Sequence, residues 1–177
     1  MSAIETTGPL LYREGYKYRV EKPLGVKTPF VGMAFVIRDA SGRQPWAELK
    51  QDGWMWAYEG YCCDGPSGPT YDWPCSIRPA TFHDIPYQGS RLGVLPDRSE
   101  AMRKRVDEFF REFLIHDGMS TIHADLWYEG VRIGAASSWA RRLEVVHESP
   151  TGNVYEVLPG SEYALRLLGG KALAVAP

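Results

Sequence analysis

The sequence predicts an α+β fold with a small N-terminal antiparallel sheet, a helical half of about three helices and a C-terminal hairpin. Residues 10–62 contain short runs of aromatic and β-branched side chains separated by Gly, Pro and Asp, a pattern typical of strands. Residues 97–142 instead carry helix start and stop signals around apolar stripes. With no fixed-period repeat and no low-complexity segment, residues 1–177 are expected to form a single domain.

The first half of the chain divides into strands and one stiff loop. Strands are expected within residues 16–20, 30–39, 47–51 and 54–61, so residues 1–63 are mainly strands. Residues 64–79 contain four Pro and two Gly. Pro fixes φ and Gly supplies the turns that Pro cannot make, so this Gly/Pro loop is predicted to be ordered.

Residues 80–142 form the predicted helical region. Pro79 suits the first turn of a helix, and Pro86 should shorten or kink that helix because it removes an interior hydrogen bond. A second helix is expected to begin at Asp97, which forms a D-x-x-E capping box with Glu100, and to end near residue 116 before Gly118. A third should run from residue 120 to about 142, with close approach to a neighbour at its small residues Gly130, Gly134 and Ala135.

The second predicted helix has one apolar stripe with an acid on its flank. The stripe follows helical spacing and contains Met102, Val106, Phe109, Phe110 and Phe113. Asp107 follows Val106 by about 100° and so lies beside Leu114 on the flank of this stripe. The basic residues of this helix alternate with Glu, which predicts a solvated face without a function, and they are Arg103, Lys104, Arg105 and Arg111.

Residues 143–177 are expected to form a hairpin, a short helix and a loose tail. The strands are LEVVHE and VYEVLP around the turn SPTGN. Ser161 is a cap for the short helix and Gly169 its stop.

Composition and charge narrow the functional classes. The chain is 44% hydrophobic and 24% charged, which is typical of a globular protein, and it has six Trp and ten Tyr. Its net charge of −2 and the absence of a recognition helix disfavour nucleic acid as a partner. No secretion signal and no run of eighteen apolar residues is present, so no transmembrane segment is expected. Three Cys without a C-x-x-C pair predict buried thiols in a reducing cytoplasm.

The first helix carries the most reactive residues of the chain. Neighbours on a helix diverge by about 100°, so His83 and Asp84 must serve different partners. Tyr87 shares a face with both, and Asp107 from the second helix could reach a ring nitrogen of His83. This division suits hydrolysis by activated water, with His83 as general base, Asp107 orienting it, and Asp84 holding a hard cation together with carbonyl oxygens of residues 64–69.

A structural role for the same residues is the alternative. A His-Asp dipeptide often caps or packs, and Asp107 could simply pair with Arg103 or Arg111. Ser67 is a conceivable nucleophile, but the loop lacks a G-x-S-x-G elbow, so its hydroxyl is expected to form a turn.

Several motifs between residues 56 and 139 resemble a known family. The ordered runs are YEGYCCDGPSGPT, FHDIPY, VDEFF, HDGM and YEGVRIG. They resemble the phage and prophage family catalogued as domain of unknown function 1353. This resemblance implies a bacteriophage or prophage origin, often in structural gene clusters, without an assigned activity.

A second, weaker likeness is to phospholipases A2, notably the compact type of parvovirus capsids. In that family a Gly-rich calcium loop precedes H-D-x-x-Y, and a later helix brings an Asp followed by Phe. The matching residues here are Gly65, Gly68, His83, Asp84, Tyr87, Asp107 and Phe110. The likeness implies Ca²⁺ bound by Asp84 and the glycine carbonyls, although Pro86 inside the H-D-x-x-Y turn and the loop spacing depart from the pattern.

Two functions therefore remain open. One is a metal-assisted hydrolase of lipid esters used in phage entry or lysis. The other is a virion structural or assembly component, of the tail or its attachment apparatus, whose partners are other phage structural proteins or copies of itself. Both place the chain in the host cytoplasm on synthesis, and the second makes it part of the virion.

Overall fold

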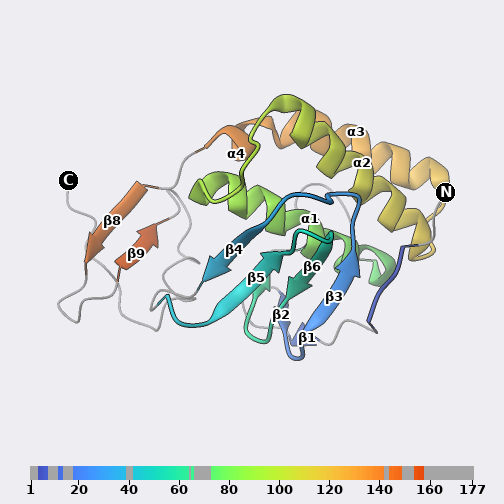
Figure 1. Cartoon of the computed structure of the whole chain (residues 1–177). Helices are drawn as coiled ribbons and strands as arrows, with labels where there is room; N and C mark the ends of the chain where they lie inside the picture. The colour runs from blue at the N-terminus through green and yellow to red at the C-terminus, as the bar shows by residue number, and fades with distance from the viewer. Residues whose placement is uncertain are drawn as a thin grey trace.

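The computed structural model describes residues 4–7, 12–13, 18–38, 42–63, 65, 73–141, 144–148 and 154–157, and of residues 12–13, 144–148 and 154–157 it describes the backbone alone. The fold is α+β, as the sequence predicts: strands come first, helices follow, and a hairpin lies after them (Figure 1). The strands before the helices are β1 (Tyr12–Arg13), β2 (Tyr18–Val20), β3 (Leu24–Lys27), β4 (Phe35–Arg38), β5 (Pro45–Leu49), β6 (Trp54–Ala57) and β7 (Cys62–Cys63). The helices are α1 (Pro74–Leu92), α2 (Glu100–His116), α3 (Thr121–Gly134) and α4 (Ala136–Ala140), and the hairpin is β8 (Glu144–Glu148) with β9 (Val154–Val157).

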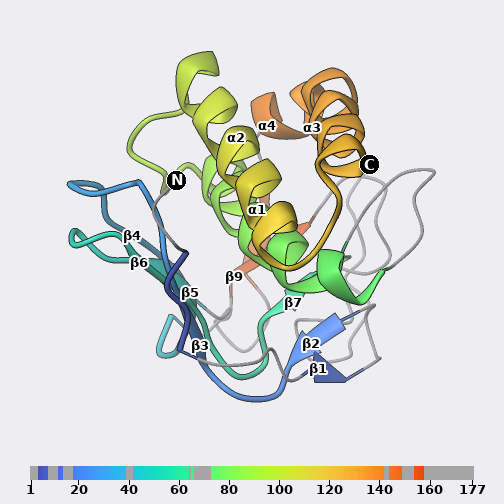
Figure 2. The same cartoon turned by 90° about the vertical axis from the view of Figure 1, so that its right-hand side faces the viewer.

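The strands before the helices form two antiparallel sheets rather than the single predicted sheet. The larger has the order β3-β6-β5-β4 and the smaller the order β1-β2-β7. Figure 2 shows the helices on one side of the larger sheet. Side chains alternate along its strands, so Val26, Met55, Leu49 and Phe35 are buried in the core that the helices cover.

β3 was not predicted because a glycine interrupts the run LGVK. A Cβ on Gly25 would lie 2.8 Å from the Trp56 ring, so the indole ring occupies the space that a side chain at this position would need. Strand propensity cannot detect that cross-strand packing.

α1 corrects the prediction most strongly, because it is 19 residues long and begins at Pro74 rather than Pro79. Trp73 is extended and Pro74 occupies the first turn, where its missing N–H costs nothing. Pro79 and Pro86 lie inside the helix and are both buried. Packing of the apolar α1 residues outweighs the two hydrogen bonds that these prolines delete.

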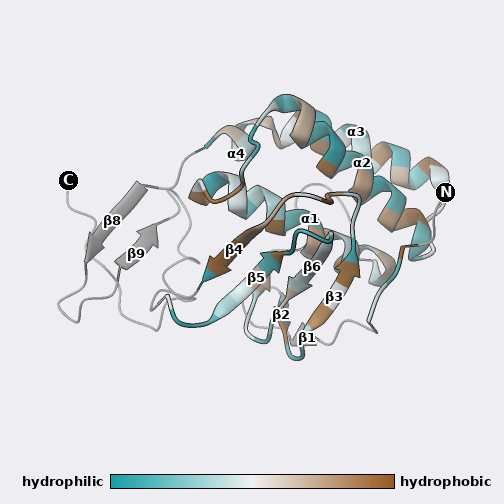
Figure 3. Cartoon of the chain, viewed as in Figure 1, coloured by the Kyte–Doolittle hydropathy of each residue, from teal (hydrophilic) through white to brown (hydrophobic). Residues whose placement is uncertain are grey.

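α2 begins two residues later than predicted. Ser99, not Asp97, is the N-cap: its Oγ accepts a hydrogen bond from the Met102 N–H at 3.1 Å, while the Asp97 carboxylate accepts from the Ser99 N–H at 2.8 Å. The helix ends at His116, and Gly118 with φ of 100° follows, as predicted. The predicted stripe is buried, and Figure 3 shows hydrophilic and hydrophobic residues alternating along α2.

The predicted third helix is in fact two helices. α3 ends at Gly134 and α4 covers the next five helical residues, with Ala135 between them. Gly130 and Gly134 are exposed, so the expected close approach at these glycines is wrong, whereas Ala135 packs against the core. The backbone of β8 and β9 forms the predicted antiparallel hairpin, and the short helix expected after Ser161 lies outside the described residues.

Candidate functional site

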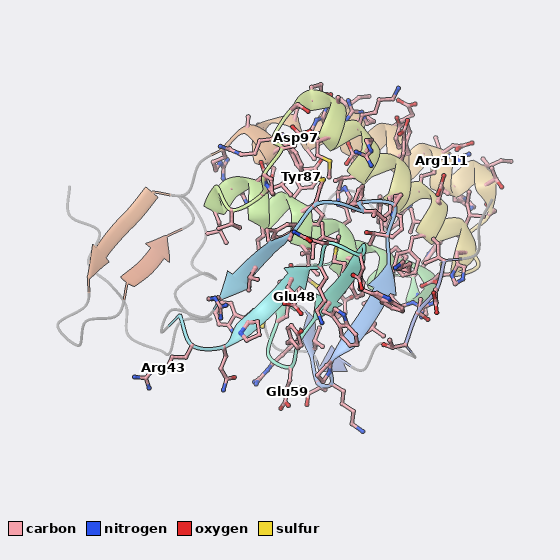
Figure 4. The ribbon with its side chains drawn as sticks, viewed as in Figure 1. Arg43, Glu48, Glu59, Tyr87, Asp97 and Arg111 are labelled. Carbon is pink, nitrogen blue, oxygen red and sulfur yellow. The ribbon has the colours of Figure 1, made fainter. Side chains whose placement is uncertain are left out.

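The contact between α1 and α2 brings His83, Tyr87 and Asp107 together. His83 and Tyr87 lie one turn apart on α1, and Asp107 faces them from α2. The side chain of Asp107 is fully buried, while His83 keeps 7% of its surface exposed. Tyr87 is labelled in Figure 4. The predicted approach of the Asp107 carboxylate to the imidazole is therefore present.

Asp107 accepts hydrogen bonds from both α1 side chains with one oxygen. His83 Nε2 lies 2.8 Å from Asp107 Oδ1, and the Tyr87 hydroxyl donates to the same oxygen at 2.9 Å. The imidazole lies between two rings, with its centroid 4.6 Å from that of Tyr87 and 4.5 Å from that of Phe110. The hydrogen-bonded pair of His83 and Asp107 is thus flanked by the aromatic rings of Tyr87 and Phe110.

The other Asp107 oxygen contacts arginines that the sequence did not assign to the site. Arg132 of α3 donates to Oδ2 at 2.7 Å, and Arg103 Nη1 lies 3.5 Å from the same atom. Glu100 binds both guanidinium groups, so three helices meet in one network of four charges and a histidine. The network has no net charge while His83 is neutral.

Two sequence interpretations need correction at this network. Arg103 is 4% exposed and does not belong to a solvated face, because its guanidinium turns inward toward α3. The sequence predicts no role for Arg132, although this residue lies in the run YEGVRIG. The alternative pairing of Asp107 with Arg103 is present beside the His83 contact, whereas Arg111 pairs with Asp125 instead.

Electrostatics determine which His83 nitrogen can act as a base. Burial would raise the pKa of Asp107, but its bonds from His83, Arg132 and Tyr87 hold that pKa below its ordinary value, so the carboxylate is ionised. An ionised carboxylate accepts only, and Nε2 must therefore carry the hydrogen. In neutral His83 the lone pair is then on Nδ1, which is the nitrogen that can take a proton from water.

The remaining side chains of the network keep fixed protonation states. Burial and the nearby Asp107 raise the pKa of Tyr87, so its phenol stays neutral and donates. Hydrogen bonds from Arg103 and Arg132 lower the pKa of Glu100 to about 2, so this acid stays charged.

The predicted metal ligands are only partly described. Asp84 is half-buried on α1, Gly65 is buried with φ of 65° against the Tyr18 ring, and Gly68 lies outside the described residues, as does Ser67. Within the described ranges, no three His, Cys, Asp or Glu side chains gather as a metal site. The other predicted ligands are carbonyl oxygens of residues 64–69, of which the structure describes Gly65.

The Gly/Pro loop begins next to α1, after β7. Cys63, the last residue of β7, has its Sγ 3.4 Å from the hydroxyl of Thr81, which precedes His83 by two residues on α1. Cys62 and Cys63 are buried thiols, as predicted, and Cys75 is half-buried. Burial raises the pKa of the Cys62 thiol, which makes it a poor nucleophile.

Comparisons with known proteins do not identify the chain. No family model, no curated protein and no solved structure matches it. The resemblance to the phage family therefore stays a prediction. Among the helices that the structure describes, none is long and apolar enough to span a membrane.

Proposed function

We propose that this chain is a phage-encoded hydrolase of esters, with phospholipids as the substrate class, in which His83 is the general base. One observation supports the proposal above the others: the 2.8 Å contact between His83 Nε2 and an ionised, fully buried Asp107. This arrangement fixes the tautomer that leaves Nδ1 basic, which is the role of the acid in a His-carboxylate pair.

The proposed reaction uses these groups in two steps. His83 Nδ1 takes a proton from water as the water oxygen attacks the ester carbonyl carbon, and a tetrahedral intermediate forms. The imidazolium then returns the proton to the leaving alkoxide as the C–O bond breaks, which yields an acid and an alcohol. Asp107 orients the ring and stabilises its charged form, and Tyr87 helps to hold the carboxylate oxygen that faces His83.

In this proposal Arg132 and Arg103 keep the Asp107 carboxylate negatively charged. Their contacts with Oδ2 keep the acid ionised in a buried position while Oδ1 remains directed at His83. A single buried carboxylate without these cations would pay a desolvation cost of several kcal/mol and would tend to protonate.

The proposal is tested by hydrolysis of a soluble activated ester and of a dispersed phospholipid by the purified chain. His83→Gln should lower turnover by about 10²–10⁴-fold, the usual contribution of a general base. The matched control is His123→Gln, because His123 is exposed on α3 and outside the network. Circular dichroism verifies that both variants are folded. Equal turnover by His83→Gln and the wild-type chain would remove the proposal.

Calcium is a separate proposal about the Gly/Pro loop and Asp84. It predicts that a chelator lowers the rate of ester hydrolysis and that Asp84→Asn loses the response to added Ca²⁺. A rate that is insensitive to chelator would leave the His83 mechanism in place without a metal.

A virion component is the second candidate, and one feature of α3 favours it. Three large apolar residues on the outer side of this helix are strongly exposed: Ile122 (74%), Leu126 (64%) and Ile133 (81%). Such a surface suits contact with another phage structural protein or a second copy of the chain. Stoichiometric copies in purified particles, together with full infectivity of particles that carry His83→Ala, would favour this role over catalysis.

A further inference from the structure

Two arginines lie at the contact between α1 and α4. Arg91 is in the last turn of α1, and Arg98 lies in the segment that joins α1 to α2. Both residues are half-buried. α4 packs against α1 (Figure 1), so the two cations lie where two helices and a connecting segment come together.

Serine hydroxyls hold both guanidinium groups at this contact. Arg98 Nε donates to Ser90 Oγ at 3.1 Å, and Arg91 Nη1 donates to Ser138 Oγ at 2.9 Å. The Ser90 hydroxyl donates in turn to the carbonyl of Trp139, the residue after Ser138, at 3.0 Å. Trp139 Nε1 donates to the Arg98 carbonyl at 2.9 Å. One continuous set of hydrogen bonds therefore fixes both arginines beside the same pair of helices.

The positive charge of this pair has no acid beside it. No carboxylate in the described part of the chain pairs with either arginine, whereas the half-buried Arg78 and Arg132 each bind an aspartate. The acid that comes next along the chain is Asp97, whose carboxylate accepts from the Ser99 N–H and lies near the charge of Arg105. Cations that are withdrawn from water are usually paired with an anion, and here the chain supplies none from its described residues.

Several donors of the two arginines remain unused. Arg91 Nη2 and both Nη atoms of Arg98 have no acceptor among the residues that the structure describes. The Nε of Arg91 is buried and has none there either. The carbonyls at the end of α1 are already occupied, because those of Gly89 and Ser90 accept from the backbone N–H groups of residues 93–95. The arrangement thus offers fixed, charged donors to an acceptor from outside the chain.

We propose that Arg91 and Arg98 bind a phosphate group, with the Ser138 hydroxyl as a third donor. Guanidinium groups are planar, stay charged and present paired N–H groups that match phosphate oxygens. Ser138 Oγ accepts from Arg91, so its own hydrogen is available for a phosphate oxygen. Two guanidinium groups and a hydroxyl together call for more acceptor oxygens than the two of a carboxylate. The proposal concerns a site separate from His83 and does not depend on hydrolysis.

Isothermal titration calorimetry of the full chain with inorganic phosphate tests the proposal. The ionic strength is held constant with chloride, so that general salt effects are equal in every sample. Binding of phosphate is expected, and Arg91→Gln with Arg98→Gln should weaken it about 100-fold, because each charged hydrogen bond contributes about 10-fold or more to affinity. Ser138→Ala should weaken binding about 2- to 10-fold, the usual contribution of a neutral donor.

A second double variant controls for net charge. Arg38→Gln with Arg141→Gln removes the same charge from exposed positions and should bind phosphate like the wild-type chain. Circular dichroism verifies that each variant is folded. If the Gln pair at the site does not fold, Arg91→Lys with Arg98→Lys keeps the charge, loses the paired N–H groups and should bind about 10-fold more weakly. The proposal is overturned if the wild-type chain does not bind phosphate, or if variants at the site bind as tightly as the Arg38 and Arg141 control.

A second titration distinguishes two sources of the phosphate group. Glycerophosphoglycerol carries the phosphodiester of a lipid headgroup without acyl chains, whereas inorganic phosphate represents a free phosphate compound. Tighter binding of the diester supports the site as one for a lipid headgroup, and tighter binding of inorganic phosphate supports it as one for a free phosphate. Binding of neither overturns it. His83→Gln should bind both compounds like the wild-type chain, so a failure of ester hydrolysis and a failure of phosphate binding are seen separately.

Discussion

Replacing Asp107 with Asn should destabilise the protein by about 3–5 kcal/mol at pH 7, because the amide leaves buried cations without their carboxylate. Asp107 is 0% exposed and forms hydrogen bonds with His83, Tyr87 and Arg132. Each hydrogen bond to a charged group contributes about 1.5–3 kcal/mol, but the three do not add, since the amide oxygen can still accept one or two of them. Glu100 also continues to compensate Arg132.

Denaturant unfolding at several pH values measures this loss. At pH 7 the urea midpoint should fall without a change of slope, and the melting temperature should fall by about 2–4 °C for each kcal/mol. Because the pKa of folded Asp107 lies below the ordinary value of about 3.9, its stabilisation is present above that value and disappears as the pH falls through the folded pKa. The difference between Asp107→Asn and the wild-type chain should therefore shrink below about pH 4.

Asp125→Asn is the control for this experiment. Asp125 is an exposed acid that pairs with Arg111, and its loss should cost less than about 1 kcal/mol. A loss below about 1 kcal/mol for Asp107→Asn at pH 7, or a difference that persists unchanged at pH 3, would show that the network of three helices does not stabilise the fold as argued.

Four further substitutions test other parts of the structure. Gly25→Ala should cost about 1–3 kcal/mol of unfolding free energy, because its Cβ would displace the Trp56 ring; an unchanged urea midpoint would contradict that packing. Burial and Glu48 raise the pKa of Tyr58 to about 12, so Glu48→Gln should return it toward 10 in an ultraviolet titration, and no shift would refute the contact. Ser99→Ala should lower the unfolding free energy by about 1 kcal/mol, because α2 loses its N-cap. A larger loss for Asp97→Ala than for Ser99→Ala would show that Asp97 is the N-cap, as the sequence predicts.

Local sequence patterns predicted the parts of this fold that local physics determines. The stripe of α2 follows helical period, and its five apolar residues are buried as expected. The same period placed Asp107 on the inner flank of α2, which is why its contact with His83 could be anticipated from spacing.

Other features depend on contacts between distant segments. α1 continues through Pro79 and Pro86 because its buried face packs on the sheet and on α2. Local helix propensity does not include the free energy gained by this tertiary packing. β3 contains Gly25 because Trp56 of another strand fills the space. Both predictions failed where tertiary packing outweighed a local preference.

The arginines of the site could not be selected from sequence for a related reason. Arg103 alternates with acids on α2, a pattern typical of a solvated surface, and only the position of α3 shows that this arginine is covered. Arg132 reaches Asp107 from 25 residues away in the chain. Charge patterning shows which residues lie near one another on one helix, but it does not show which helix covers them.

The position of the hydrogen on the neutral His83 ring decides whether Nδ1 can act as the general base. Two-dimensional ¹⁵N NMR of the histidine side chains distinguishes Nε2–H from Nδ1–H in the neutral form. With the ionised Asp107 as acceptor, His83 should carry its hydrogen on Nε2, and Asp107→Leu should abolish that preference. A neutral His83 with its hydrogen on Nδ1 in the wild-type chain would contradict the account, because the nitrogen proposed as the base would already be protonated.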